Sequence, residues 1–471
     1  KPGACVGFTG CVDSQKLHMA YGLSDGFRYK IIVTFSDLKA REIFEDYQFY
    51  DREVTWYPAK DLIFYQADIH GNQLVTERMK ALRKIIEGKP QTVITTFAAL
   101  MSPQVPLEEI AASVIHIDAD SSLNEGELAR KLAEMGYEKN YQVDAPGQFS
   151  IRGGIIDIFD LTEENPYRIE LWGEEVESIR SFDLLSQRSV EKLNEVDIYP
   201  ATEMMLSEEQ KEKGLRRIEK EAKEFEEKLR SSFLTEEAHR VKTQIKELRE
   251  QVMEFSQMTN LESYIRYFYE DTVSFLRFFP EGESCVFIDE AARVKEQALA
   301  VEMEFRESMG HRLEKGYILP GQADLLYGWE ETAGFLQHMR TVLFSSMDSS
   351  NALLKPQRKF DVNVKSMSSY NSSFDALVAD LKRYKKNGYR VLLLSGSRTR
   401  ARRLAEDLQE QGLASFYSED GERVVNSGEV MLYYGHVKRG FEYPLLKFVV
   451  ITESDIFGVQ KKKKKHKKKF E

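Results

Sequence analysis

The stretch "GFTGCVDSQK", residues 7–16, has the outline of a phosphate-binding loop near the start of the chain. Such loops follow the pattern G-x-x-x-x-G-K-[S/T], in which backbone N–H groups and the lysine hold the phosphates. Val12 stands where the second glycine belongs, and Asp13 replaces the lysine. A carboxylate repels phosphate, and a β-branched residue resists the backbone conformation that glycine adopts there. The stretch therefore predicts a degenerate nucleotide loop, whose residues are Gly7, Gly10, Asp13 and Ser14.

The segments that follow this loop alternate between strand-like and helix-like patterns. "KIIVTF" (30–35) and "QTVITTF" (91–97) are typical of buried strands, whereas residues 37–47 and 76–88 have the pattern of helices. The second helix ends at a glycine, which is common at helix C-termini. Such alternation predicts a parallel sheet with helices on its faces, as in nucleotide hydrolases. The expected fold class is therefore α/β.

Composition changes along the chain predict its domain organisation. Residues 1–120 form the first part of the α/β domain, and residues 121–201 form a small α+β insert with antiparallel strands split by glycine and proline turns. Residues 202–355 carry long charged helices, expected to be solvated rather than to bind a partner. Residues 356–457 form a separate α/β domain, and residues 458–471 are a lysine-rich linker.

Composition also limits the function classes. The chain has 471 residues, 42% of them hydrophobic and 30% charged, with a net charge of −11, which is ordinary for a soluble protein of about three domains. An acidic balance argues weakly against broad contact with the nucleic-acid backbone and leaves a local basic face open. Three cysteines without C-x-x-C spacing predict a reducing, cytoplasmic compartment without a zinc site or disulfide framework, although Cys5 and Cys11 could pair. No apolar run approaches the ~20 residues of a membrane helix, and no metal or cofactor site is expected.

Two further segments have a structural and a functional interpretation. "SCVFIDEAARV" (284–294) places Asp289 where nucleotide hydrolases hold magnesium-bound water, but Asp13 in the lysine position favours a buried strand ending in a helix cap. "LLLSGSRTRARRLAE" places Ser397 before a helix N-terminus. Helix starts bind anions, but an N-cap is the simpler use of this serine.

The stretch "APGQFSIRGGIIDIFDLTEENPYRIELWGEEVESIRSFDLLSQRS" (145–189) is long and unusual. It resembles the module shared by the excision-repair protein UvrB and the bacterial transcription-repair coupling factors (the Mfd family), and "RGGIIDIF…RIELW…SIRSFD…SQR" is closer to the coupling factors. "WYPAKDLIFYQ" (56–66), "GYILPGQADLLYGWEE" (316–331) and the closing "FEYPLLKFVVITESDIFG" with its lysines extend the similarity over nearly the whole chain. The resemblance implies that residues 1–120 and 202–355 form one UvrB-like domain around the insert.

The family resemblance implies a function for this chain and for a longer parent. UvrB carries a tyrosine-rich hairpin after the segment similar to "WYPAKD" and has an intact phosphate loop; this chain lacks both patterns. It therefore resembles the N-terminal half of a coupling factor, which binds UvrA. ATP, magnesium, DNA and RNA polymerase would be engaged by the missing motor half, and the resemblance suggests that this half masks the UvrA-binding face in the intact protein. This chain is expected to have no catalytic residue; the alternative is a divergent nucleotide-hydrolysing helicase or UvrB-type excision-repair module.

The segment "RIELW" (168–172) in the insert predicts an exposed binding surface. Side chains alternate across a strand, so Ile169 and Leu171 face inward while Arg168, Glu170 and Trp172 share the other face. Tryptophan and arginine are the residue types most enriched at binding hot spots, and an exposed aromatic side chain in a strand is costly to leave unused.

The strand "FSIRGG" (149–154) is expected to lie beside this segment and to bring Arg152 near Arg168, which forms a flat patch suited to carboxylates on a partner. The competing interpretation pairs Arg152 with Glu170 and packs Trp172 under a loop. The family resemblance favours the binding surface, because Arg152, Arg168 and Trp172 match positions that the family uses to bind UvrA. On the same grounds, weaker candidates are Arg180, Phe182 and Arg188.

Overall fold

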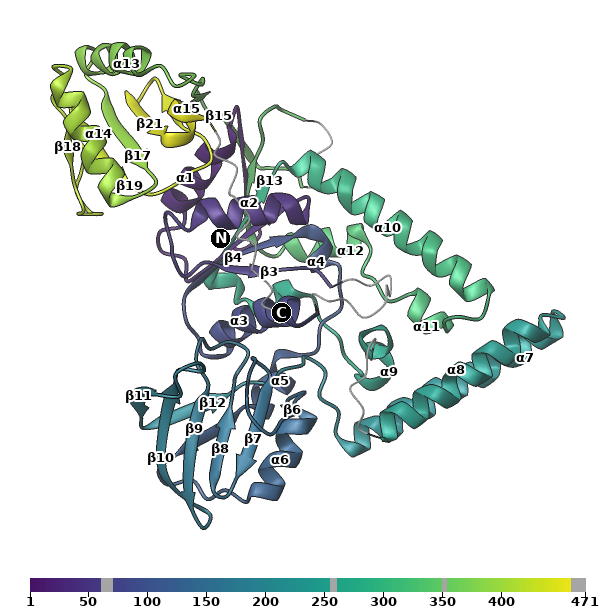
Figure 1. The fold of residues 1–471 in the computed structure, drawn as a ribbon. Helices are drawn as coiled ribbons and strands as arrows, with labels where there is room; N and C mark the ends of the chain where they lie inside the picture. Colours follow the sequence, from purple (N-terminus) through teal and green to yellow (C-terminus); the bar gives the residue numbers. More distant parts are fainter. Residues whose placement is uncertain (61–70, 255–260, 350–353, 459–471) are drawn as a thin grey trace, which may run out of the picture.

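The computed structural model describes residues 1–60, 71–254, 261–349 and 354–458. A central α/β domain carries the small insert at one end and the C-terminal α/β domain at the other (Figure 1). The predicted fold class, a UvrB-like α/β domain with an inserted α+β domain and a separate C-terminal α/β domain, is confirmed.

The central sheet has seven strands in the order β15-β1-β14-β13-β2-β4-β3, and every pair in it is parallel. The predicted strand segments 30–35 and 91–97 correspond to β2 and β4. The strands of this sheet are β1 (Cys5–Thr9), β2 (Tyr29–Thr34), β3 (Thr55–Tyr57), β4 (Gln91–Thr96), β13 (Ser284–Asp289), β14 (Arg340–Phe344) and β15 (Arg358–Asp361).

Helices cover both faces of this sheet, so its strands are apolar on both sides. In β2, Ile31 and Val33 belong to one hydrophobic cluster and Ile32 to the cluster on the opposite face. The predicted helix 37–47 is α2, and the segment 76–88 lies largely in α3, with Gly88 in the left-handed conformation just beyond its end. The helices of this domain are α1 (Asp13–Leu23), α2 (Asp37–Tyr47), α3 (Gly71–Ile86), α4 (Phe97–Leu100), α5 (Leu107–Ser113), α9 (Ile265–Phe268), α10 (Ala291–Glu314), α11 (Pro320–Ala323) and α12 (Trp329–Leu336), with short 3-10 turns at Leu261–Tyr264, Phe275–Phe278 and Glu281–Glu283.

The insert is a six-stranded sheet in the order β11-β10-β9-β8-β7-β6, with a two-stranded sheet β12-β5 beside it. Its hydrophobic core lies between the sheet and α6 (Glu125–Glu134). Because β5 pairs with β12, the pairing of the insert begins at Ile115, before the predicted boundary at residue 121. The strands are β5 (Ile115–Asp118), β6 (Glu138–Lys139), β7 (Gln148–Arg152), β8 (Ile155–Ile158), β9 (Tyr167–Trp172), β10 (Glu175–Phe182), β11 (Ser189–Leu193) and β12 (Glu195–Ile198).

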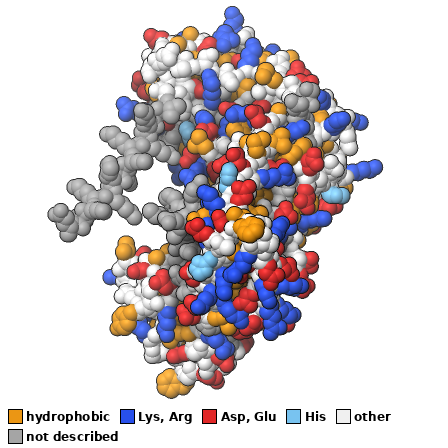
Figure 2. Space-filling view, turned by 90° about the vertical axis from the view of Figure 1, so that its right-hand side faces the viewer, with side chains coloured by type: hydrophobic (Ala, Val, Ile, Leu, Met, Phe, Trp, Pro, Cys, Tyr) orange, Lys and Arg blue, Asp and Glu red, His pale blue; other side chains and the backbone are white. Residues whose placement is uncertain are grey.

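The charged segment after the insert forms a helical hairpin, α7 (Glu208–Ser231) and α8 (Thr235–Met253), which projects from the central domain (Figure 1). Charge pairs one turn apart, such as Arg230 with Glu226, lie on its surface. Figure 2 views the molecule from the side of the long helices and shows acidic and basic side chains intermingled over that face. This pattern agrees with the predicted solvated helices.

The C-terminal domain has a six-stranded sheet in the order β16-β20-β21-β17-β19-β18, with a hydrophobic core of its own. Ser397 caps α14, as predicted, by accepting a hydrogen bond from the N–H of Arg400. Residues 358–361 form β15 of the central sheet, so the C-terminal domain begins after Asp361 and not at residue 356. Its elements are β16 (Lys365–Ser366), α13 (Phe374–Lys386), β17 (Arg390–Ser395), α14 (Arg398–Glu410), β18 (Phe416–Tyr417), β19 (Val430–Tyr434), β20 (Phe441–Tyr443), β21 (Phe448–Thr452) and α15 (Glu453–Phe457).

Several predictions concern features outside these elements. The predicted lack of a wedge hairpin after "WYPAKD" falls on residues 61–70, and the lysine-rich linker falls on residues 459–471; both segments lie outside the described residues. Within the described ranges, no helix is long and apolar enough to cross a membrane, and no cluster of side chains is arranged to hold a metal ion. The cysteines at positions 5, 11 and 285 are buried thiols, so Cys5 and Cys11 are not paired.

Candidate functional site

The loop between β1 and α1 keeps the shape of a nucleotide loop. Gly10 has a φ of +75°, and a Cβ at this position would lie 2.6 Å from the carbonyl oxygen of Val362, so only glycine fits. At Gly7, a Cβ would lie 3.2 Å from a carbon of the Pro356 ring, which is a tight contact. Both predicted glycines therefore serve the packing of this loop against the segment that follows β14.

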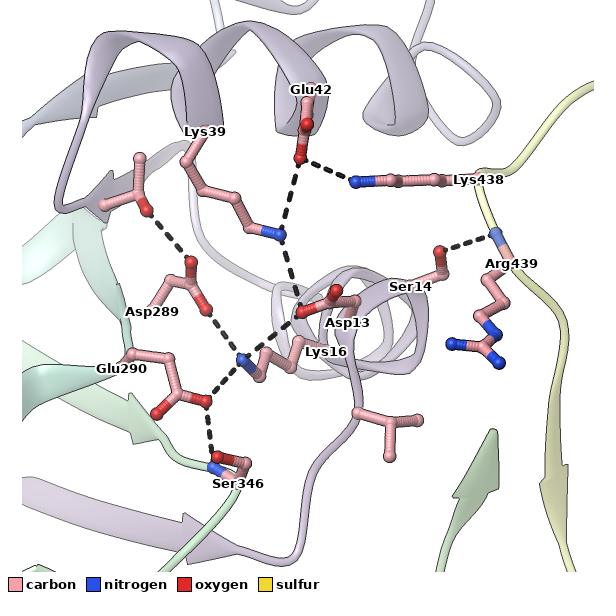
Figure 3. A network of polar contacts seen from close by, with 12 residues as sticks. Asp13, Ser14, Lys16, Lys39, Glu42, Asp289, Glu290, Ser346, Lys438 and Arg439 are labelled. Atoms are coloured by element: carbon pink, nitrogen blue, oxygen red, sulfur yellow. Dashed lines mark hydrogen bonds and ion pairs between the residues drawn. The ribbon is translucent and has the colours of Figure 1, made fainter. Parts of the chain in front are cut away.

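Lys16 of α1, which the loop pattern did not identify, pairs with two acids beside the degenerate loop. The Nζ atom of Lys16 lies 2.9 Å from Oδ1 of Asp289 and 2.7 Å from Oε1 of Glu290, and its side chain is only 6% exposed (Figure 3). Burial alone lowers the pKa of Lys16, but the two carboxylates outweigh it and raise the pKa above its ordinary value. Asp289 is thus neutralised by a side chain of the protein itself.

Asp289 and Glu290 each accept one further hydrogen bond. Asp289 accepts a hydrogen bond from Oγ1 of Thr34 at 2.9 Å, and Glu290 accepts one from the backbone N–H of Ser346 at 2.9 Å. Beside them, Asp13 lies 3.4 Å from Nζ of Lys39. The cavity among these side chains is about 20 Å³, which is enough for a single water and far too small for a nucleotide.

The C-terminal domain contacts the first turns of α1, directly after the degenerate loop. The backbone N–H of Arg439 donates to Oγ of Ser14 at 3.2 Å (Figure 3). This hydroxyl donates in turn to Oδ2 of Asp46 at 3.2 Å. The hydroxyl of Tyr443 contacts Nε2 of Gln15 and Nδ1 of His18 at 3.2 and 2.9 Å. The serine at the predicted magnesium-ligand position therefore joins two domains.

Asp46 makes the contact between these domains sensitive to pH. Burial raises its pKa to about 7, although Ser14, Lys438 and Lys39 act in the opposite direction. Since the folded state holds this proton more tightly than the unfolded state, the contribution of Asp46 to stability falls as pH rises from about 4 to 7. We expect Asp46→Asn to reduce this fall by at least about 1.4 kcal/mol, the equivalent of one pKa unit. Urea unfolding at pH 5 and pH 8 measures the effect, and an unchanged pH dependence would contradict it.

The predicted binding surface lies on the outer face of the insert sheet. Ile169 and Leu171 of β9 are buried in the core of the insert, and the indole of Trp172 is 80% exposed, so the predicted alternation is confirmed. Trp172 is not packed under a loop. Its exposed indole ends a strand whose outer face also carries Arg168 and Glu170.

The prediction that Arg152 and Arg168 lie on neighbouring strands is wrong, because β8 lies between β7 and β9. Both arginines nevertheless contact the same residue of β8, Asp157. Arg168 donates from Nε and Nη2 to the two carboxylate oxygens of Asp157 at 2.8 and 2.9 Å, and Nη2 of Arg152 lies 3.8 Å from Oδ2 of the same carboxylate. Asp157 is a functional candidate that sequence reasoning missed.

The weaker candidates occupy different positions on this surface. Arg180 pairs with Glu170 at 2.8 Å, so Glu170 is not the partner of Arg152. Phe182 is 1% exposed, and the Arg168 guanidinium lies 4.2 Å from its ring centroid; this residue therefore supports Arg168 from beneath and offers no contact surface. Arg188 is exposed in the turn after β10.

An exposed tyrosine extends the surface beyond the predicted residues. Tyr141 is 83% exposed, and the guanidinium of Arg152 lies 5.5 Å from its ring centroid. The surface therefore combines three arginines, two carboxylates and two exposed aromatic rings, and its net charge is +1. Its residues are Arg152, Arg168, Arg180, Asp157, Glu170, Tyr141 and Trp172. We call these seven residues the insert face; it is suited to a partner that offers carboxylates and apolar contact.

Comparison with known proteins gives one match for the insert and further matches over most of the chain. Residues 115–204 match the UvrB interaction domain family, and this range begins at β5, where the pairing of the insert begins. The chain is 31% identical over 421 residues, or 89% of its length, to the transcription-repair-coupling factor of Bacillus subtilis (strain 168). It is 27% identical over 427 residues, or 90% of its length, to the transcription-repair-coupling factor of Staphylococcus aureus (strain Mu50).

The matches to both relatives span only part of those proteins, 35% of each. The similarity nevertheless extends over about nine tenths of this chain, so it reaches into each of its three domains. The chain is therefore similar over this length to the transcription-repair-coupling factors, and its insert matches the UvrB interaction domain family.

Proposed function

We propose that this chain is the UvrB-like module of a transcription-repair coupling factor and that it recruits UvrA through the insert face. The observation that carries this proposal is that Trp172 is 80% exposed on the sheet face that also carries the arginines held in position by Asp157. Aromatic and arginine side chains of this kind dominate the free energy of protein interfaces. The matched UvrB interaction domain and the coupling-factor relatives support the same partner.

The experiment is a calorimetric titration of UvrA into the purified chain. A saturable complex is expected, and the chain with Trp172→Ala is expected to bind much more weakly. Absence of binding by the unaltered chain would overturn the proposal. Binding that survives substitution of the insert face would leave UvrA as the partner but would move its site elsewhere on the molecule.

The proposal assigns no nucleotide hydrolysis to this chain, which is expected to act as a scaffold. In the longer parent protein, an ATP- and magnesium-dependent motor would act on DNA and displace stalled RNA polymerase, and that half could cover the insert face. The alternative, a divergent nucleotide hydrolase, requires space and a free cation at the degenerate loop. The cavity of about 20 Å³ and the pairing of Lys16 with Asp289 and Glu290 favour the scaffold.

A nucleotide titration separates these two functions. ATP with magnesium is expected to give no saturable heat with the unaltered chain, because Lys16 is already paired with the acids and the cavity beside Asp13 and Lys16 is only about 20 Å³. Ser14→Ala and Asp289→Asn are expected to leave this result unchanged. Saturable ATP binding that either substitution abolishes would favour the hydrolase instead.

A further inference from the structure

A row of aromatic rings crosses the boundary between the central and C-terminal domains. It starts at Tyr21 of α1, passes through Phe49 and Tyr50 after α2, and ends at Tyr433 and Tyr434 of β19. Neighbouring ring centroids are 5.1, 5.1, 6.3 and 4.7 Å apart for Tyr21–Tyr50, Tyr50–Phe49, Phe49–Tyr433 and Tyr433–Tyr434, respectively. The rings therefore form a continuous contact series of about 20 Å.

A cavity of about 510 Å³ lies along this row. Rings from both domains line it, together with aliphatic side chains, two arginines and an aspartate of the C-terminal domain; the lining includes Tyr21, Phe49, Tyr50, Tyr433, Arg390 and Arg423. Tyr21 is 50% exposed, so a planar group has access to a ring face at this end. The volume is in the range of sites for small aromatic ligands or a single base.

Three arginines along the row have no carboxylate at ion-pair distance within the described residues. Arg52 and Arg398 each donate to the hydroxyl of Tyr434, at 3.2 and 3.3 Å, and Arg390 lies 5.8 Å from the ring centroid of Phe448. Arginines held by aromatic groups keep their positive charge available to an anion, unlike the nearby Arg402, which pairs with Glu419 at 2.8 Å.

We propose that this row binds single-stranded DNA, with a base stacking on the exposed ring of Tyr21 and backbone phosphates meeting Arg52, Arg390 and Arg398. Proteins bind single strands by combining aromatic stacking surfaces with arginines that follow the backbone. A base has two apolar faces and a phosphate on each side, so it matches an exposed ring with arginines near the ends of the row. Duplex DNA hides its base faces and matches this row poorly. The choice of DNA over RNA rests on the proposed repair function.

Fluorescence anisotropy with labelled oligo(dT) of about 15 nucleotides, near the upper end of known site sizes, tests the proposal. Binding by the full chain is expected at low salt, and duplex DNA is expected to bind more weakly. Tyr21→Ala is expected to weaken binding of oligo(dT) about five- to hundredfold, the measured range for loss of one stacking ring. Arg398→Ala is expected to weaken binding and to lower its dependence on salt.

Matched controls distinguish DNA binding at this row of rings from general electrostatic attraction between the chain and DNA. Tyr317 is 48% exposed and Arg240 lies 4.5 Å from its ring centroid, so Tyr317→Ala removes an equivalent stacked tyrosine at a distant place. Arg130→Ala removes one exposed charge from the insert. Both controls are expected to bind oligo(dT) as the unaltered chain does. The lysines of residues 459–471 are present in every variant, so they produce no difference between them.

Three results would overturn the proposal: no binding by the unaltered chain, equal effects of the row and control substitutions, or tighter binding of oligo(U) than of oligo(dT). Circular dichroism of each variant shows whether the fold is retained. Capture of UvrA is an independent measurement on the insert at the opposite end of the molecule (Figure 1). A failure of DNA binding therefore leaves the proposed UvrA recruitment intact, and the reverse also holds.

Discussion

Replacing Lys16 by methionine is expected to lower the free energy of unfolding by about 3–5 kcal/mol, the usual cost of removing one partner from a buried ion pair. The Lys16 side chain is 6% exposed, and its Nζ atom contacts both Asp289 and Glu290. Methionine fills a similar volume but leaves two acids without their shared cation. The expected loss therefore comes from uncompensated negative charge and not from a cavity. Urea unfolding at pH 7 measures it.

A triple substitution identifies the cause of this loss. Lys16→Met with Asp289→Asn and Glu290→Gln removes all three charges and keeps acceptors for Thr34 and Ser346. Its unfolding free energy is expected to return to within about 1 kcal/mol of the unaltered value or above it, since neutral replacement of a buried ionic cluster is often harmless. A triple variant as unstable as the single one would show that Lys16 acts through packing.

Two further measurements test the electrostatic origin of the effect. Lys89 is 65% exposed and pairs with Glu87 at 2.9 Å, so Lys89→Met is a matched loss of an exposed ion pair and is expected to cost less than about 1 kcal/mol. Below about pH 4, carboxylates begin to bind protons, and the penalty in the Lys16 variant is expected to shrink. A penalty independent of pH would contradict a charge effect.

Sequence reasoning identified what the degenerate loop had lost but not what replaced it. The missing lysine at position 13 was readable from local spacing, because the phosphate-loop pattern is contained in eight consecutive residues. The substitute, Lys16, acquires its role from Asp289, which is 273 positions away in the chain. Its buried pairing depends on how β13 and α1 pack together, which no local pattern specifies.

The strands and the insert face show the same difference between what a local pattern predicts and what the packing of distant segments decides. The alternation in residues 168–172 correctly placed Ile169 inward and Trp172 outward, because side-chain direction in a strand has a fixed period. The neighbour of β9 was predicted wrongly, since the order of strands is set by turns and core packing over the whole insert. Asp157 was missed for this reason: its contact with Arg168 appears only when β8 lies next to β9.

Replacing Trp172 by alanine is expected to weaken UvrA binding by about 2 kcal/mol or more, corresponding to roughly thirtyfold in the dissociation constant. The side chain is 80% exposed, so its removal costs the free chain little stability. Phe233 is an exposed aromatic residue of similar exposure, 91%, at the turn between α7 and α8. Phe233→Ala is therefore the matched control and is expected to leave UvrA binding unchanged in the same titration.

Removal of Arg168 requires a second substitution, because Asp157 beneath it has a side chain that is only 2% exposed. Alanine at position 168 alone would leave a buried carboxylate unpaired and would destabilise the insert. Arg168→Ala with Asp157→Asn removes both charges together and is expected to reduce UvrA binding about as much as Trp172→Ala does. Arg168→Lys keeps the charge but loses the two parallel hydrogen bonds, so it is also expected to bind weakly. Unchanged affinity in all three variants would remove the insert face as the UvrA site.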